Sequence, residues 1–247
     1  MLEKHLLPLS LSLLIAIVVT FALFLGLKEW EISKTTNNNA LKKQKLISVS
    51  TIIPNILMYI LLAPYWSLIY FNLKQYVVFE IHSYYLSIPL ALILCDFSYY
   101  CEHRIAHKST FLWKLYHGTH HTAINYNIPV AYRVNALNFL IAPLFYLPWV
   151  ILGIEPILVI GMQLFVFHYQ GWVHTNLIGK LRYDKYFNTP ANHRMHHSIK
   201  NNNVNFSAIF MIWDHLFHTY QKPVSCTKYG IEDRNTDDSY IGIYTDF

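Results

Sequence analysis

The sequence has few charged residues and few cysteines. Only 13% of its 247 residues are charged, and its three cysteines include no CxxC pair. An odd number of cysteines without paired spacing indicates neither a disulfide framework nor a thiolate metal site. The sequence also lacks a glycine-rich dinucleotide fingerprint and has no room for a haem domain. These absences exclude a chain that carries its own nicotinamide or haem.

Apolar residues dominate what is present. They make up 54% of the chain, and aromatic residues make up 16%. This composition is typical of a membrane protein. The formal net charge of +5 is modest, and the lysines and arginines lie between apolar runs. We therefore interpret them as topology signals and not as a nucleic-acid footprint.

Five apolar runs approach the ~20 residues that a membrane-spanning helix needs. They cover residues 6–27, 46–71, 84–101, 136–152 and 157–173. A cleavable signal peptide is the alternative for the first run, but Lys28, Glu29 and Trp30 follow it where small residues would mark a cleavage site. Prolines within 136–173 leave open a re-entrant hairpin there. We predict one all-α integral membrane domain, residues 1–247, with four to five transmembrane or re-entrant helices.

Lysines concentrate in the connector at residues 28–45, which places that connector in the cytoplasm by the positive-inside rule. The second run then leads outward and the third returns, so the following segments form a cytoplasmic helical cap. The other basic residues fall on the same side: Arg104, Lys108, Lys114, Arg133, Lys180, Arg182, Lys185, Arg194 and Lys200. The membrane itself, a bacterial inner membrane or the endoplasmic reticulum, is left open.

Twelve of the 14 histidines lie between His103 and His218, and most of them are clustered. Residues three and four apart share a face of a helix, so each cluster points one way. Imidazole binds iron, zinc, copper and nickel, and eight imidazoles are more than one metal can use. The spacing therefore predicts two metals close together. The clusters are His103 and His107; His117, His120 and His121; and His193, His196 and His197. The isolated His5, His82 and His168 are interpreted as structural.

The surroundings of the clusters favour iron over zinc. No cysteine lies near them, which disfavours a structural thiolate zinc site. A paired-zinc hydrolase would normally use bridging carboxylates, and few acidic residues are available: Asp96, Glu102, Asp184 and Asp214. The clusters lie at the membrane edge, where an apolar substrate could enter from the lipid. Histidine-bound iron with open positions can activate O₂ for attack on an unactivated C–H bond.

Further residues complete a pattern around the histidines. Asp96 to Tyr100 precede the first cluster, Trp113 and residues 126–127 and 133 accompany the second, and residues 172–176, 188–190 and 213–217 follow in order. These motifs resemble the fatty acid hydroxylase superfamily, which includes sterol desaturases and alkylglycerol monooxygenase. They are most similar to the alkylglycerol monooxygenase and bacterial sterol desaturase-like branch. The resemblance covers residues 86–220, which we take as the catalytic region.

The resemblance implies a membrane-bound non-haem di-iron oxygenase. Such an enzyme hydroxylates or desaturates a fatty acyl, alkyl ether or sterol-type lipid with O₂, using electrons from a separate reductase, electron-carrier protein or pterin. Which lipid, which of the two reactions and which oligomeric state are left open. Carried onto this sequence, the iron ligands are His103, His107, His117, His120, His121, His193, His196 and His197, with His174 as a ninth.

Five charged residues near the clusters are candidates for supporting roles. Asp96, Glu102 and Asp214 could accept the free N–H of a ligand imidazole. An ion pair or a helix cap is an equal alternative for each of them. Arg104 and Arg194 could hold these carboxylates or meet lipid headgroups.

Two departures from the family pattern and one rival function accompany this interpretation. Asn192 stands where the family often has histidine, and His218 replaces a glycine in the closing turn. His215 and His218 are assigned to the surface or to a supporting role. The rival is a membrane protein that sequesters or transports zinc, for which we expect ligands near the middle of the bilayer. An inactive structural relative is a third alternative.

Overall fold

The computed structural model describes residues 2–34, 39–79, 81, 83–201, 203–232 and 242–245. These parts of the chain are helical, with two isolated β-bridges and no strand. The longer helices are α1 (Leu2–Lys34), α2 (Asn39–Ser50), α3 (Ile52–Leu73), α4 (Tyr84–Lys108) and α9 (Pro156–Val173). The short ones are α5 (Thr110–Leu112), α6 (Gly118–His121), α7 (Asn138–Ile141), α8 (Leu147–Ile151), α10 (Pro190–His196), α11 (Ile212–Leu216) and α12 (Gly242–Thr245). Tighter or wider turns form η1 (Lys74–Tyr76), η2 (Trp113–His117), η3 (Ile128–Tyr132) and η4 (Ala142–Tyr146).

Four segments of the described chain are long and apolar enough to cross a membrane: Ser12–Ser33, Lys42–Tyr76, Tyr84–Lys108 and Pro156–Val173. Large apolar side chains on them are widely exposed, including Leu23 at 63%, Leu57 at 63% and Tyr85 at 87%. Water would penalise such a surface, whereas lipid would not. The predicted fold class, an all-α integral membrane protein, is confirmed.

The apolar run at residues 136–152 forms no single long helix. It divides into α7, η4 and α8, and Pro143 and Pro148 stand at the starts of the second and third pieces. Proline has no N–H to donate and a fixed φ, so it begins a helical segment and interrupts one already under way. The described residues therefore supply four spanning helices and not five.

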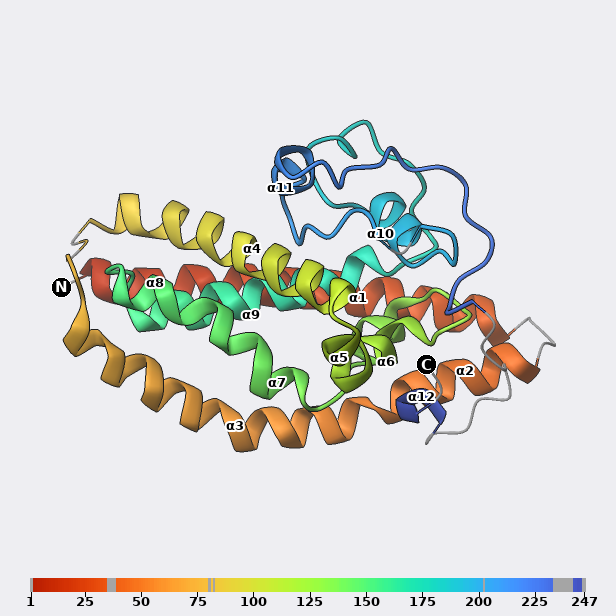
Figure 1. Cartoon of the computed structure of the whole chain (residues 1–247), viewed down its shortest axis with the longest axis horizontal. Helices are drawn as coiled ribbons and strands as arrows, with labels where there is room; N and C mark the ends of the chain where they lie inside the picture. The colour runs from red at the N-terminus through yellow and green to blue at the C-terminus, as the bar shows by residue number, and fades with distance from the viewer. Residues whose placement is uncertain are drawn as a thin grey trace.

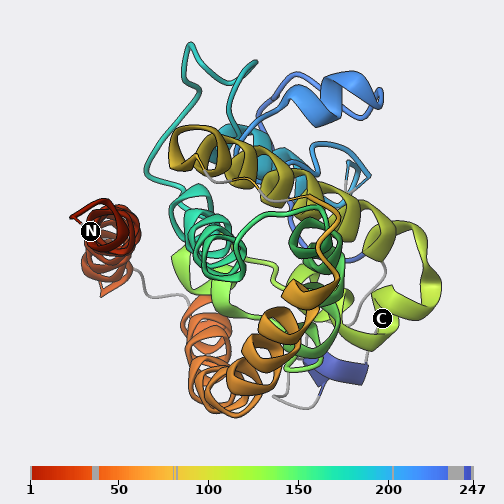
Figure 2. The same ribbon diagram turned by 90° about the vertical axis from the view of Figure 1, so that its left-hand side faces the viewer.

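The long helices lie along the longest axis of the molecule (Figure 1). α1, α4 and α9 run in one direction and α3 runs back, so the ends of the first three and the start of α3 lie at the same end (Figure 1). α9 is the most enclosed span: 56% of its apolar stretch is buried, against 17% for α1. α9 packs against both α1 and α4, and α1 forms one edge of the bundle (Figure 2).

The lysine-bearing helix α2 lies at the same end as the histidines. Arg133, which follows η3, donates from Nη1 to Gln44 Oε1 of α2 at 2.9 Å. Lys42, Lys43 and Lys45 occupy the same helix. The basic segment and the histidines therefore share one side of the bundle, as the positive-inside rule requires. That this side is cytoplasmic stays a prediction.

Two buried aspartates hold the irregular chain that follows α10. Asp214 accepts from the backbone N–H of Phe206 at 2.9 Å and of Ser207 at 2.8 Å. Asp96, from the middle of α4, accepts from Ile209 N at 2.7 Å and from Trp213 Nε1 at 2.8 Å. A loop without regular structure needs such partners for its backbone groups. The two carboxylates therefore fix residues 206–213 against α4, next to the histidines.

Candidate metal centre

Three parts of the fold carry the clustered histidines to one place. The last turns of α4 hold the first cluster, η2 and α6 hold the second, and α10 with the residue after it holds the third. His174 follows the last residue of α9. Pro190 opens α10, because its fixed φ suits the first helical turn. Each histidine thus lies at or near the end of a helix. All of them are at the same end of the bundle as α2.

The ring nitrogens converge in two sets. The five-histidine group consists of His103, His107, His117, His121 and His196. The four-histidine group consists of His120, His174, His193 and His197. Within each group one nitrogen from every side chain lies within 4.8 Å of the others. The structure therefore brings together all nine side chains that the sequence singled out.

Each HxxHH motif divides between the two groups. His120 and His121 are neighbours but join different groups, and so do His196 and His197. A step of four residues on a helix ends about 40° past a full turn, whereas a step of one turns about 100°. Residues four apart therefore stay together, and the residue between them faces the other group. The prediction that all three histidines of a motif point one way is corrected by this geometry.

His174 stands at the centre of the four-histidine group. Its Nδ1 lies 2.6 Å from the carbonyl oxygen of Gln170. Because a carbonyl only accepts, Nδ1 carries the hydrogen and Nε2 keeps its lone pair. That Nε2 lies 3.1, 3.2 and 3.3 Å from the Nε2 atoms of His193, His120 and His197. Four ring nitrogens are therefore aimed at one buried point.

Backbone carbonyls orient two members of the five-histidine group in the same way. His103 Nδ1 lies 2.8 Å from the Phe206 oxygen, and His196 Nδ1 lies 2.8 Å from the Val204 oxygen. The Nε2 atoms of both histidines are buried without a hydrogen-bond partner in the described structure. A buried polar atom without a partner costs free energy. Both lone pairs therefore point to a place where a ligand would satisfy them.

The spacing of the nitrogens fits a metal ion in each group. In the five-histidine group, His107 Nε2 lies 2.9 Å from His117 Nε2 and 3.1 Å from His121 Nε2. Nitrogens bound to zinc at about 2.0–2.1 Å lie ~2.9 Å apart at right angles and ~3.3 Å apart in a tetrahedron. The distances from His107 Nε2 and from His174 Nε2 fall within this range. Lone pairs aimed at one another repel unless a cation lies between them, so the donor sets fit metals that imidazole binds.

Burial keeps these imidazoles neutral. It lowers the pKa of His121, His193 and His197 well below the ordinary value, and neighbouring imidazoles lower it further. Burial also lowers the pKa of His174 to about 3, although its hydrogen bond to Gln170 acts in the opposite direction. Neutral imidazole is the form that donates a lone pair to a metal. The groups are therefore in their metal-binding form at neutral pH.

The carboxylates predicted to orient the imidazoles bind elsewhere. Asp96 and Asp214 hold the 206–213 segment, as described above, and Glu102 accepts from Tyr116 Oη at 2.5 Å. The carbonyl oxygens of residues 170, 204 and 206 take the expected role instead. Asp214 acts only indirectly, because it binds the N–H of Phe206, whose carbonyl faces His103.

The two arginines singled out by the sequence also bind neutral groups. Arg104 donates from Nη1 to Tyr100 Oη at 3.0 Å, and its guanidinium lies over the ring of Phe217. Arg194 donates from Nη1 to the carbonyl oxygen of Thr175 at 2.7 Å. No ion pair is recorded for either arginine within the described ranges. Arg194 thus braces the segment that carries His174.

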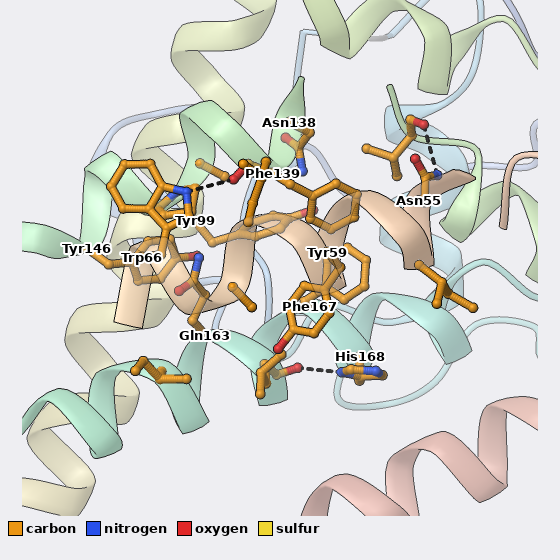
Figure 3. A pocket seen from close by; sticks show the side chains of 18 of the residues that line it. Asn55, Tyr59, Trp66, Tyr99, Asn138, Phe139, Tyr146, Gln163, Phe167 and His168 are labelled. Carbon is orange, nitrogen blue, oxygen red and sulfur yellow. Dashed lines mark hydrogen bonds between the residues drawn. The ribbon is translucent and has the colours of Figure 1, made fainter. Parts of the chain in front are cut away.

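A cavity of about 340 Å³ lies between α3, α4, η4 and α9. Aromatic side chains form much of its wall, and Trp66 donates from Nε1 to the Phe139 carbonyl at 3.0 Å (Figure 3). Tyr99 and Glu102 of α4 belong to the same wall. The Tyr99 ring lies 5.3 Å from the ring of His103, centroid to centroid. The cavity therefore adjoins the five-histidine group through Tyr99.

The isolated histidines stay outside both groups where they are described. His168 lies on the cavity wall, with Nδ1 2.8 Å from the Leu164 oxygen (Figure 3). His215 is exposed, with Nε2 2.9 Å from the Lys185 oxygen. The side chains of His5 and His82 lie outside the described parts of the chain.

Comparison with known proteins places this geometry in a family. A family model described as fatty acid hydroxylase matches residues 88–219, slightly more than half of the chain. The chain belongs to the fatty acid hydroxylase family. All nine grouped histidines lie in the matched region. The resemblance predicted from the motifs is therefore confirmed.

Named relatives cover part of the chain. Alkylglycerol monooxygenase of Homo sapiens is 32% identical over 144 residues, 57% of this chain and 32% of the relative. The Xenopus tropicalis enzyme of the same name is 32% identical over 145 residues, 58% and 32% of the two chains. Ornithine lipid hydroxylase OlsE of Rhizobium tropici is 33% identical over 158 residues, 58% and 45%. The match thus spans between a third and a half of these relatives, and no solved structure matches significantly.

Two departures from the fatty acid hydroxylase pattern leave both histidine groups intact. His218 has a φ of 58°, the left-handed conformation that glycine adopts most easily, so the closing turn is kept. Asn192 is buried and donates from Nδ2 to the carbonyls of Asp184 at 2.7 Å and Phe187 at 3.0 Å. It supports the segment before α10 and belongs to neither group.

Sequence reasoning assigned no supporting role to two residues beside the four-histidine group of this fatty acid hydroxylase family member. The Tyr126 ring stacks on the His174 ring, with centroids 5.4 Å apart and an interplanar angle of 16°. Glu29 of α1 accepts from Thr175 Oγ1 at 2.6 Å. An acidic residue near the end of an apolar span is a signal that could have identified Glu29. Tyr126 belongs to the pattern at residues 126–127 around the second cluster, but that pattern assigned no role to its ring.

Proposed function

We propose that the protein is a membrane-bound non-haem di-iron oxygenase that hydroxylates or desaturates a lipid. The observation that carries this proposal is the convergence of nine neutral imidazoles in two adjacent groups beside an apolar cavity. Each group would hold one iron through its ring nitrogens. The assigned ligands are His103, His107, His117, His121 and His196 for one iron, and His120, His174, His193 and His197 for the other.

Bound iron would supply O₂ activation and removal of hydrogen from an unactivated C–H bond. Hydroxylation turns one C–H bond and O₂ into an alcohol and water, and it consumes two electrons and two protons. Desaturation removes two hydrogens from the lipid and yields two waters. It consumes O₂, two electrons and two protons, as hydroxylation does. The sequence has no glycine-rich dinucleotide fingerprint, so we assign the electrons to a separate reductase, electron-carrier protein or pterin.

The chain's own residues orient both partners of this reaction. The carbonyls of residues 170, 204 and 206 fix the tautomers of three histidines, so that Nε2 faces the metal. The cavity wall, built from spanning helices α3, α4 and α9, would admit an apolar chain from the lipid and exclude water. Tyr99 lines the cavity and its ring contacts that of His103, so a hydrocarbon bound there would have its reacting carbon near the five-histidine group.

The substrate class follows from the cavity and the relatives together. The relatives are named for alkylglycerols and ornithine lipids, both of which join a polar head to a hydrocarbon chain. The wall of this cavity is largely aromatic and aliphatic, which suits the hydrocarbon part. We therefore propose a lipid of this kind as substrate and a multi-pass location with the histidine end in the cytoplasm. Residues 86–220 are proposed as the catalytic region of a single membrane-embedded unit, residues 1–247.

Iron analysis with an oxygen-consumption assay tests the proposal. The full chain is purified in detergent with iron and assayed with membrane lipid and a reductant, and lipid products are analysed by mass spectrometry. We expect two irons per chain and lipid-dependent O₂ uptake. His120→Ala should abolish O₂ uptake and the binding of one iron. His215→Ala, at an exposed position, should change neither quantity. Tightly held zinc without O₂ uptake would support the rival metal-binding function, and full turnover by His120→Ala would refute the site.

A further inference from the structure

α1 lies outside the region that matches the fatty acid hydroxylase family, yet it contacts residues next to the four-histidine group. Family matching begins at residue 88, and α1 ends at Lys34. α1 packs along α9, the helix that ends just before His174. The contact is tight near the histidines: a Cβ added at Gly171 would lie 3.1 Å from the Ala22 Cβ. Small residues at such a crossing let two helices approach.

Glu29 uses this close approach to bind two separate segments of the site. Its Oε1 accepts from Thr175 Oγ1 at 2.6 Å and from Asn176 N at 3.0 Å. Its Oε2 accepts from Ile128 N at 2.9 Å. The side chain is buried, and its three donors come from residues 99 to 147 positions later in the chain. A carboxylate near the end of a membrane span is costly unless it is bound in this way.

Both bound segments touch the four-histidine group. Thr175 and Asn176 directly follow His174, and Asn176 donates from Nδ2 to the carbonyl of Tyr126. The Tyr126 ring stacks on His174, and Tyr126 Oη donates to the Val173 carbonyl at 2.7 Å. Glu29 therefore closes a loop of contacts around one imidazole. The hydrogen bonds that Glu29 accepts from Thr175, Asn176 and Ile128 involve no member of the five-histidine group.

We infer that Glu29 is a positioning residue for the metal of the four-histidine group. It fixes the two residues that follow His174 and the segment at Ile128, close to Tyr126, so it holds the imidazole where Nε2 meets the other three nitrogens. Outer partners of metal-binding histidines typically change metal affinity by about 10–100-fold when removed. This inference rests on the proposed function, since it requires that the group binds a metal.

The test compares Glu29→Gln with Glu31→Gln in the full chain. Glu31 lies on the same helix, but it is exposed and pairs with Lys28 at 3.1 Å. The metal-free protein in detergent is titrated with Co²⁺ alone, and His120→Ala identifies the equivalent that belongs to the four-histidine group. We expect Glu29→Gln to lower the affinity for that Co²⁺ equivalent by about 10–100-fold and to leave the affinity for the other unchanged. Glu31→Gln should bind both equivalents as the unchanged chain does.

Two results would overturn the inference. One is unchanged binding of both equivalents by Glu29→Gln, and the other is equal weakening of both, which would indicate a general role in the fold. If Glu29→Gln does not fold, Thr175→Ala removes a single donor and should weaken the same equivalent by a smaller factor. Unchanged binding by Thr175→Ala would then refute the inference. If the unchanged chain does not bind two equivalents, the proposed function fails whatever Glu29 does.

Discussion

The two histidine groups contain the same kind of side chain, but the contacts that brace them come from different parts of the chain. The five-histidine group is braced by the carbonyls of Val204 and Phe206, and Tyr99 separates it from the cavity. The four-histidine group is braced by Gln170 within α9 and by Glu29 of α1. The group beside the cavity therefore depends on the loop after α10, whereas the other depends on spanning helices. Substitutions should consequently affect the two metals separately.

Substituting one histidine of each group should give the largest effects and should distinguish the two metal sites most clearly. We expect His107→Ala and His174→Ala each to lose one metal equivalent, and turnover to fall at least ~100-fold, because even outer partners of metal ligands cost about 10–100-fold. The lost equivalent should be a different one in each variant, as measured by metal analysis and by Co²⁺ titration. Loss of the same equivalent in both variants would contradict the division of the histidines into two groups.

Asp214→Asn should weaken metal binding by the five-histidine group and leave metal binding by the four-histidine group unchanged. Asp214 binds the N–H groups of Phe206 and Ser207, and the Phe206 carbonyl orients His103. An amide can accept only one of these bonds in place, so we expect a loss of about 1–3 kcal/mol of stability. The measurements are thermal unfolding and the affinity of each metal equivalent.

Glu155→Gln is the matched control for that substitution. Glu155 forms an exposed ion pair with Lys74 at the opposite end of the bundle. Exposed pairs contribute about 0–1 kcal/mol, so metal binding should stay unchanged. If Asp214→Asn weakens the equivalent marked by His120→Ala, the proposed support of the two groups by separate parts of the chain is wrong.

Ala63→Phe should give the smallest effect. It should lower kcat/KM through the cavity beside the five-histidine group and leave metal binding unchanged. Ala63 of α3 lines the cavity, and a phenyl ring there would take space from a bound hydrocarbon chain. One methylene in an apolar pocket changes kcat/KM by about 10–200-fold, so we expect a decrease of about 10-fold or more for the longest lipids. Both metal equivalents should bind normally. Leu57→Phe, at a lipid-exposed position of the same helix, should leave kcat/KM unchanged.

The histidines of the two groups could be identified from the sequence because their spacing is local. Four residues on a helix make nearly one turn, so the pairs His103 and His107, and His193 and His197, converge by geometry alone. The division of His120 from His121 was missed, because the spacing does not say that a second group lies on the adjoining face. That division depends on where α9 and α10 end relative to α4, which is a matter of tertiary packing.

The supporting contacts were harder to predict. Charged residues near the histidines suggested carboxylate partners, but Asp96 and Asp214 hold loop backbone and carbonyl groups orient the rings. Every residue carries a carbonyl, so no sequence signal marks the ones that are used. The four spanning helices followed from hydropathy, whereas the broken helix at residues 136–152 depended on how Pro143 and Pro148 divide it.

The use of main-chain oxygens to orient the rings has a consequence for how this protein tolerates change. A side-chain acceptor disappears with a single codon change, whereas the oxygens at residues 170, 204 and 206 remain whatever amino acid is encoded there. Drift at these three positions can therefore alter bulk and polarity around the centre while the tautomer of each ring is preserved. The orientation of these three imidazoles is therefore less sensitive to point substitution than a carboxylate partner would make it.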